Sequence, residues 1–217
     1  MILYHGSKSG IKGQIAPGSR ERCDFGKGFY LGDMPEQPQG LIAEHKDHVF
    51  YEIDFQPEGL NTKEFRDDYA DQIDWALFIA YNRDKTLFTG NDILIQKYEM
   101  YNNTYDVIIG LIADDSMIPT LTQFFNGDIS DKVMLECLKM VRLGKQYVLK
   151  TAKACSNDHI KIISSRTLTF KEKKMATAQA SHRKDRMSSE LSAIKARYRR
   201  DPSVKYFDEI IEECNKC

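Results

Sequence analysis

A histidine near the N-terminus stands where it could contact a ligand. It belongs to the segment Tyr4-His5-Gly6-Ser7, which follows the apolar start of a short predicted strand. An imidazole can donate or accept a hydrogen bond near neutral pH, and a following glycine lets another molecule approach the backbone closely. The same pattern also fits a histidine that only caps a strand end. The segment therefore gives a candidate site with two interpretations.

A second candidate is the glycine-rich segment at residues 24–30, with the sequence DFGKGFY. Its two glycines permit a tight turn and close approach of the backbone, and two aromatic residues follow at once. The ring of Tyr30 could offer a flat face to a planar ligand, or both aromatics could belong to the core. The segment has neither of the two glycine spacings that are typical of phosphate-binding loops.

The third candidate is Gln146, which opens the sequence QYVLK at residues 146–150. The apolar residues that follow the glutamine predict a strand. An amide at the start of such a strand could either hydrogen-bond a ligand or lie in solvent at the edge of a sheet.

In this order, the three segments resemble a known enzyme family. His5-Gly6-Ser7, FGKGFY at residues 25–30 and a strand opened by Gln146 resemble the H-Y-[E/Q] layout of the diphtheria-toxin and poly(ADP-ribose) polymerase branch of the ADP-ribosyltransferases. More narrowly, LYHGS, DFGKGFYL, YDVIIGLIADDSM and QYVLKT resemble a family of small bacterial relatives, which includes toxins paired with a small antitoxin.

The resemblance implies a split β-sandwich with NAD, the substrate, in its cleft. It implies that His5 hydrogen-bonds a ribose hydroxyl of NAD and that the backbone of Gly6 meets the nicotinamide carboxamide. Ser7 is expected beside it, and Gly28 belongs to the same expected NAD-binding set. Tyr30 is expected to stack on the nicotinamide ring.

The expected catalytic residues are Gln146, His5 and Tyr30, with Gln146 at the family's catalytic glutamate position. Cleavage of the nicotinamide–ribose bond develops an oxocarbenium-like cation, which the enzyme must stabilise. A glutamate would supply a hydrogen bond and a negative charge, whereas a glutamine supplies only the hydrogen bond. We therefore expect slow transfer of single ADP-ribose units to a macromolecular acceptor, whether protein or nucleic acid, and no chain elongation.

The segment at residues 33–40 departs from the family pattern. It contains two prolines and a glycine where the relatives begin a helix. That helix supplies a serine and a second aromatic ring to the nicotinamide pocket of the relatives, and neither residue is evident in this segment.

Two motifs invite a metal hypothesis that we do not favour. Asp114 and Asp115 follow the predicted strand at residues 105–112, where two acids are explained by the N-terminus of a helix. Cys214 and Cys217 form a CxxC pair, but no second half-site completes a zinc centre. We expect no metal cofactor.

The remaining patterns predict an α+β fold with a helical appendage. Alternation predicts a strand at residues 48–55, and helical spacing predicts helices at residues 68–82 and from Ser130 onward. We divide the chain into a transferase-like domain, residues 1–170, and a basic helical C-terminal extension, residues 171–217. The extension carries an apolar stripe on a long helix: Met187, Leu191, Ile194 and Tyr198.

The composition narrows the functional classes. The chain has 217 residues, and 31 Lys and Arg nearly balance 32 Asp and Glu, so net charge alone does not indicate a nucleic-acid or membrane binder. No apolar run is long enough to span a membrane, and the N-terminus lacks the features of a signal peptide, so we expect a cytoplasmic protein. Two other hypotheses stay open: an inactive binding module with this fold, and a nucleic-acid-binding protein that acts through the basic extension.

Overall fold

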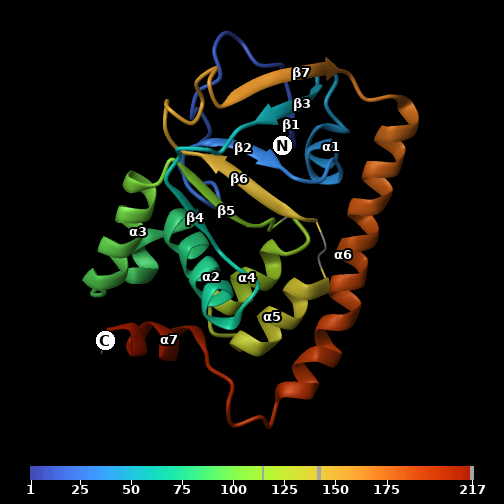
Figure 1. The fold of residues 1–217 in the computed structure, drawn as a ribbon. Helices are drawn as coiled ribbons and strands as arrows, with labels where there is room; N and C mark the ends of the chain where they lie inside the picture. The colour runs from blue at the N-terminus through green and yellow to red at the C-terminus, as the bar shows by residue number, and fades with distance from the viewer. Residues whose placement is uncertain (114, 141–142, 216–217) are drawn as a thin grey trace.

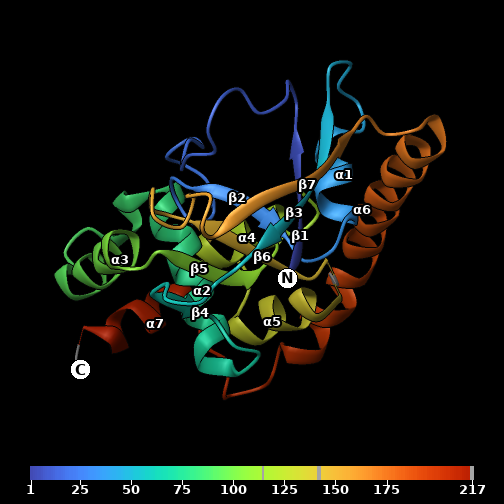
Figure 2. The same ribbon diagram turned by 45° about the horizontal axis from the view of Figure 1, so that its top comes forward.

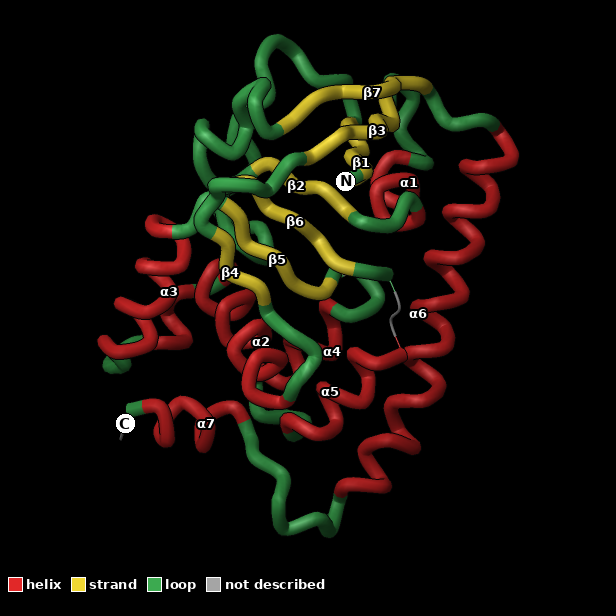
Figure 3. Tube along the Cα trace, in the orientation of Figure 1, coloured by secondary structure: helices red, strands yellow, loops and turns green. Residues whose placement is uncertain are grey.

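The computed structural model describes residues 1–113, 115–140 and 143–215, which form a seven-stranded sheet with helices around it (Figures 1 and 3). This mixed architecture is compatible with the expected α+β class. The strands are β1 (Ile2–Ser7), β2 (Phe29–Gly32), β3 (Val49–Phe55), β4 (Thr62–Glu64), β5 (Val107–Leu111), β6 (Lys145–Leu149) and β7 (Ile160–Arg166). The helices are α1 (Glu36–Ile42), α2 (Tyr69–Arg83), η1 (Lys85–Phe88), α3 (Asp92–Thr104), α4 (Ile118–Phe125), α5 (Asp131–Met140), α6 (Phe170–Tyr198) and α7 (Phe207–Cys214).

The sheet consists of two groups of strands that are joined by a single register pair. The strand order is β4-β5-β6-β2-β1-β3-β7, and every pair is antiparallel except the parallel pair β4 and β5. Strand β1 pairs with β3 at six successive positions, and β2 pairs with β6 at four. Between β1 and β2 only Tyr4 and Gly32 are in register. The two groups therefore diverge on either side of this contact.

Both faces of the sheet are covered, because side chains alternate along each strand. In β5, Ile108 packs with Trp75 and Phe78 of α2 in the larger core cluster. Its neighbours Val107 and Ile109 belong to a second cluster on the other face of the sheet. The run of consecutive apolar residues predicted at 105–112 is thus a strand buried on both faces.

Helix α2 forms where helical spacing predicts it. Asp68 is its N-cap, and its side chain accepts a hydrogen bond from the backbone N–H of Asp71. The capping role predicted for Asp114 and Asp115 is not observed for Asp115, because α4 begins only at Ile118. Asp114 lies outside the described residues. Proline at the second position of α4 explains the later start, because proline favours the first helical turn.

Helix α1 forms despite its prolines. Pro35 is the N-cap and Pro38 is the third helical residue, where the missing N–H has no acceptor within the helix. The backbone N–H of Gln39 donates to the carbonyl of Pro35, which closes the first turn. The prolines that disfavour a helix in general are therefore placed where a helix tolerates them.

The predicted extension packs on the rest of the chain. Helix α6 runs along one side of the molecule, past α1 and α5 (Figures 1 and 2). Met187 and Ile194 from its apolar stripe are buried in the larger core cluster, and Leu191 and Tyr198 pack against it. Phe207 of α7 lies within the same cluster, beside Phe88 and Phe124. Residues 171–217 and the remainder of the chain thus share one core. None of the helices in the described ranges is both long and apolar enough to cross a bilayer.

The start of α6 is fixed by a capping box that is sensitive to acid. The Thr169 side chain accepts a hydrogen bond from the backbone N–H of Glu172, and the Glu172 carboxylate accepts from the backbone of Thr169. Arg166 forms two further hydrogen bonds with Glu172, at 2.7 and 2.9 Å. These contacts with Arg166 and then Thr169 lower the pKa of Glu172 from 4.5 to about 2.

We predict that Glu172→Gln destabilises the protein above pH 4.5 and that this effect disappears as the pH falls toward 2. Because the folded-state pKa is lowered, the carboxylate contributes stability above its unfolded pKa and loses it on protonation. The measurement is the difference in Tm between the variant and the wild type at several pH values. Glu190→Gln, an exposed change on the same helix, is the control. A difference that stays constant with pH would contradict the prediction.

Candidate functional site

The candidate site is a cleft of about 350 Å³ at the divergence of β1 and β2. His5 of β1, Tyr30 of β2 and Gln146 of β6 all line it. These three residues are the expected catalytic set, and three strands bring them together. Gln146 lies on an inner strand of the sheet, so the solvent-exposed edge position considered for it is wrong.

His5 is held in a fixed orientation. The sequence predicted His5 at the end of a short strand. The strand instead extends to Ser7, so the histidine lies within β1. The His5 Nδ1 is 2.7 Å from the carbonyl oxygen of Tyr30, and the imidazole stacks on Phe29 at a ring separation of 4.4 Å. A carbonyl can only accept, so Nδ1 carries the proton and a neutral ring keeps Nε2 as an acceptor. Burial lowers the pKa of His5, which favours this neutral form at pH 7, although the hydrogen bond to Tyr30 opposes the shift.

Tyr30 has a structural role besides the one expected of its ring. Its hydroxyl donates to the carbonyl of Gly26 at 2.7 Å and accepts from the backbone N–H of Phe25 at 3.0 Å. Burial raises the pKa of Tyr30 well above 10, so the hydroxyl stays protonated. Tyr30 therefore ties the glycine-rich loop to β2, and it is also one of the residues that line the cleft.

Gln146 is buried, with 6% of its surface exposed, between two glycines on the neighbouring strands. Gly32 of β2 and Gly110 of β5 are its register partners. The Gln146 Nε2 donates to the carbonyl of Leu111 at 3.2 Å, an oxygen that also accepts from Trp75 Nε1. Within the part of the chain that the structure describes, the amide oxygen accepts no hydrogen bond, so it is available to a hydroxyl donor in the cleft.

Of the other expected NAD-binding residues, one lines the cleft and two lie outside it. Gly6 lines the cleft, and a Cβ there would lie 2.4 Å from the carbonyl oxygen of Pro38, so glycine is also needed for α1 to pack. A Cβ at Gly28 would lie 2.4 Å from Val148, and Gly28 lines a separate pocket behind His5 and Tyr30. Ser7 lines neither pocket and pairs with Val49 at the end of β1.

The cleft is richer in positive charge than the sequence indicated. Four arginines from three parts of the chain line it: Arg20, Arg22, Arg83 and Arg183. Two carboxylates, Asp24 and Asp115, also line it. Asp24 pairs with Arg83 at 2.5 Å; burial raises the pKa of Asp24, and the pairing opposes this shift. Among the described lining residues, arginines outnumber carboxylates, which favours an anionic ligand.

Sequence reasoning missed these charges because they are distant in the chain. Arg20 and Arg22 lie in the irregular segment at residues 8–28, Arg83 ends α2 and Arg183 lies in the middle of α6. Only packing brings the four together, and no spacing pattern in the sequence connects them. The alternation of arginine with other residues in SRERCD, residues 19–24, is the one local signal that could have drawn attention to the first two.

A half-buried lysine supports the glycine-rich loop. Lys150 donates to the carbonyl of Phe25 at 2.5 Å and to the side chain of Asn102 at 3.0 Å. Burial lowers the pKa of Lys150 to about 8. Gly26 has a φ of +68°, and a Cβ there would lie 2.7 Å from Asn82, so glycine is required at this turn.

Metal ligands do not gather anywhere in the described ranges: no three His, Cys, Asp or Glu side chains come together in an arrangement that could hold an ion. Cys217 of the CxxC pair lies outside those ranges, as does Asp114.

The comparisons with known proteins identify one family. A family model described as "Protein of unknown function (DUF3990)" matches residues 1–160. Searches of the curated proteins and of the solved structures return no match. The matched range contains β1 to β6 and thus His5, Tyr30 and Gln146, but it ends before α6 and Arg183.

We predict that Tyr30→Phe lowers the free energy of unfolding by about 1–3 kcal/mol, because it leaves the N–H of Phe25 and the carbonyl of Gly26 without a side-chain partner. Urea denaturation measures the change. Tyr147→Phe, on the adjacent strand β6, is the matched control, since its hydroxyl forms no hydrogen bond within the described residues. Equal stability of Tyr30→Phe and the wild type would contradict the anchoring role.

Proposed function

We propose that this chain, which belongs to the DUF3990 family of proteins of unknown function, transfers single ADP-ribose units from NAD to a macromolecular acceptor. The observation that carries the proposal is the meeting of His5, Tyr30 and Gln146 in one cleft, in the order and chemistry that the resemblance to H-Y-[E/Q] transferases implies. In the chain, Gln146 follows Tyr30 by more than 100 positions.

The sheet supports the finer assignment to a transferase-like split β-sandwich. In such a fold, the NAD cleft opens where two groups of strands separate. Strands β1 and β2 touch only at Tyr4 and Gly32, and the cleft lies beside this contact. All seven strands are nevertheless joined in one hydrogen-bonded order.

The cleft residues have suitable chemistry for binding the nicotinamide riboside half of NAD. The neutral His5 can accept a hydrogen bond from a ribose hydroxyl through Nε2, because Nδ1 is engaged with the Tyr30 carbonyl. The ring of Tyr30 can stack on the nicotinamide. Since Phe29 and Tyr30 already fix the imidazole, little orientational entropy is lost when the ligand binds.

Gln146 is the proposed hydrogen-bond partner of the nicotinamide ribose, the sugar at which the substitution occurs. Its free amide oxygen can accept from the 2′-hydroxyl as the bond from C1′ to the nicotinamide nitrogen breaks. The nicotinamide leaves with the electron pair, the acceptor nucleophile bonds to C1′, and its proton passes to water. Because an amide carries no negative charge, it stabilises the developing cation less than a glutamate would. A slow single transfer follows from this chemistry.

The cleft arginines are the proposed ligands of the NAD diphosphate. Guanidinium groups pair with phosphate oxygens through two parallel hydrogen bonds, so several of them can bind a dinucleotide. Arg20 and Arg22 extend from the loop before β2, and Arg183 extends from α6 on another wall. The extension would then form part of the substrate site.

The biological setting rests on the resemblance alone. We propose a cytoplasmic toxin or defence effector, held inactive by a small antitoxin protein. The acceptor is a protein or a nucleic acid, and the labelling experiment below distinguishes the two.

We predict that the purified protein transfers label from NAD, labelled in the adenylate moiety, to one fraction of a cell lysate. His5→Ala and Gln146→Ala should reduce the transfer at least 100-fold, because each removes a contact to the reacting ribose. Gln56→Ala, an exposed loop change, is the matched control. Label is followed separately into protein, nucleic acid and free ADP-ribose.

The same experiment separates the proposal from its alternatives. Calorimetric titration with NAD accompanies it. Binding without any transfer would favour an inactive module of the same fold, and the absence of both binding and transfer from folded protein would overturn the proposed function.

We predict that Arg183→Gln weakens NAD binding about tenfold, because it removes one charge-assisted hydrogen bond to the diphosphate. Arg186→Gln makes the same charge change on the same helix at an exposed position outside the cleft lining and should have little effect. Dissociation constants from calorimetry test this. If the two variants bind NAD equally, α6 has no direct part in binding.

A further inference from the structure

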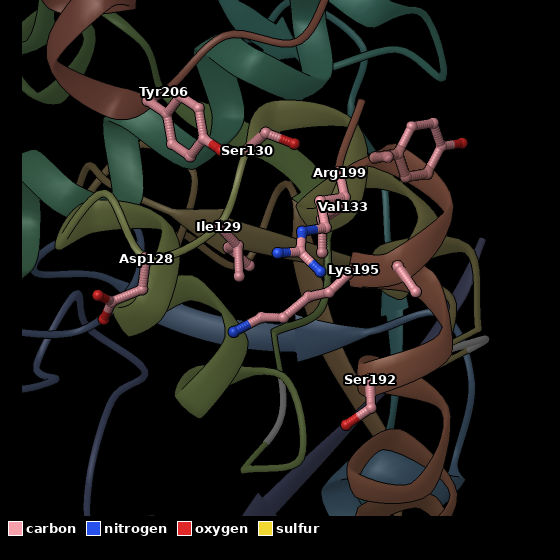
Figure 4. A pocket seen from close by; sticks show the side chains of 10 residues that line it. Asp128, Ile129, Ser130, Val133, Ser192, Lys195, Arg199 and Tyr206 are labelled. Atoms are coloured by element: carbon pink, nitrogen blue, oxygen red, sulfur yellow. The ribbon is translucent and has the colours of Figure 1, made fainter. Parts of the chain in front are cut away.

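A second pocket lies between the body of the protein and its C-terminal helices. Its volume is about 350 Å³, and its walls come from the α4–α5 connection, the C-terminal end of α6 and the segment before α7 (Figure 4). We call it the α6-end pocket and define it by four lining residues: Ser130, Lys195, Arg199 and Tyr206. It shares no lining residue with the cleft at β1 and β2.

Ser130 provides a buried polar group without a partner. The residue is 3% exposed, and its hydroxyl forms no hydrogen bond in the described parts of the chain. A serine directly before a helix commonly caps it, yet the Ser130 side chain accepts no hydrogen bond from the first turn of α5, and only its backbone carbonyl accepts, from the N–H of Met134. Figure 4 places its side chain in the pocket between those of Tyr206 and Arg199. A buried hydroxyl left unpaired is costly, and a ligand in the pocket would satisfy it.

Two cations in the same pocket are not neutralised. The ammonium group of Lys195 donates to the neutral amide of Gln123 at 2.7 Å, and Arg199 forms no ion pair with any residue in the described ranges. Neighbouring cations pair with carboxylates instead: Lys132 with Asp201, Arg197 with Glu136 and Lys205 with Glu213. Lys195 and Arg199, which line the pocket, thus have no carboxylate partner among the described residues.

The groups in the pocket match a phosphate. A guanidinium fork, an ammonium group and a hydroxyl donor all belong to residues that line it. The pocket also contains the carboxylate of Asp128, which is exposed and within ion-pair distance of neither cation. Among the charged side chains that line the pocket, the surplus is one positive charge.

Tyr206 narrows the class of ligand. It is 43% exposed and lines the pocket beside Ser130. An exposed aromatic ring next to phosphate-binding cations is the combination by which proteins bind nucleotides, since every base has a flat face for stacking. We propose that the α6-end pocket binds a nucleotide phosphate, with the base against Tyr206. The phosphate belongs either to a free nucleotide or to a nucleic-acid strand.

The helix dipole alone could explain why cations lie at this helix C-terminus. The test must therefore distinguish the effect of the dipole from binding of a ligand. Lys and Arg near the end of α6 are favoured by the helix dipole whether or not a ligand binds. Arg200 is exposed at the same helix end but does not line the pocket, so it experiences the dipole without the site. It is therefore the matched control for Arg199.

The test measures binding of AMP and of a fluorescent 5′-phosphorylated single-stranded RNA to the full chain at low ionic strength. Arg199→Gln should weaken binding about tenfold, and Arg200→Gln should change it less than twofold. Tight binding of AMP assigns a free nucleotide, whereas binding of the RNA alone assigns a strand, and either supports the proposal. No binding of either probe by the wild type overturns it. Equal losses in the two variants also overturn it, as does binding that Arg199→Gln leaves unchanged, which would place the nucleotide elsewhere.

Ser130→Ala supplies a second test that does not depend on charge. Removing an unpaired buried hydroxyl should leave the Tm unchanged or raise it, so the variant folds. If the hydroxyl donates to phosphate, the same variant should bind AMP or the RNA at least threefold more weakly. Unchanged binding in a variant of equal or higher Tm would remove Ser130, and with it the built site, from the proposal.

Discussion

The narrow contact between β1 and β2 is the constraint on which the rest of the structure depends. The two strands share a single register pair, Tyr4 with Gly32, and diverge from it. His5 bridges the opening through its hydrogen bond to the Tyr30 carbonyl, so a side chain replaces part of the backbone ladder that a continuous sheet would have there. A sheet that diverges in its middle leaves polar backbone and side-chain groups around an open space, which is the physical origin of the cleft.

Close packing against glycines keeps the walls of this opening in place. Helix α1 approaches β1 where Gly6 leaves room for the carbonyl of Pro38, and the glycine-rich loop approaches β6 at Gly28. A Cβ at Gly110 would lie 2.7 Å from Phe25 and 2.9 Å from Trp75, so β5 also needs a glycine beside Gln146. Each glycine thus contributes by being small where two elements meet. The glycines expected to contact NAD are required by the packing of the protein itself, whatever the ligand.

Charge is balanced over the whole chain but not at either pocket. The numbers of acids and bases in the chain are nearly equal, while among the described residues the linings of the cleft and of the α6-end pocket each contain more basic than acidic side chains. Helix α6 contributes to both, with Arg183 in its middle and Lys195 and Arg199 near its end. Because its Met187 and Ile194 are anchored in the main core, these cations are held on a rigid element. The helix that follows the family-matched range is therefore structurally continuous with the candidate site.

The sequence by itself determined the elements whose signals are local. Alternation located β3, apolar content located β5 and β6, and Asp68 with helical spacing located α2, because side-chain periodicity and capping act over a few residues. The resemblance selected His5, Tyr30 and Gln146, which the fold brings into one cleft. Only the tertiary structure decided that α1 tolerates its prolines, that Ser7 and Gly28 lie outside the cleft, and that arginines from distant segments line it. These outcomes depend on strand order and on the packing of helices against the sheet, which relate residues far apart in the chain and leave no periodic trace in the sequence.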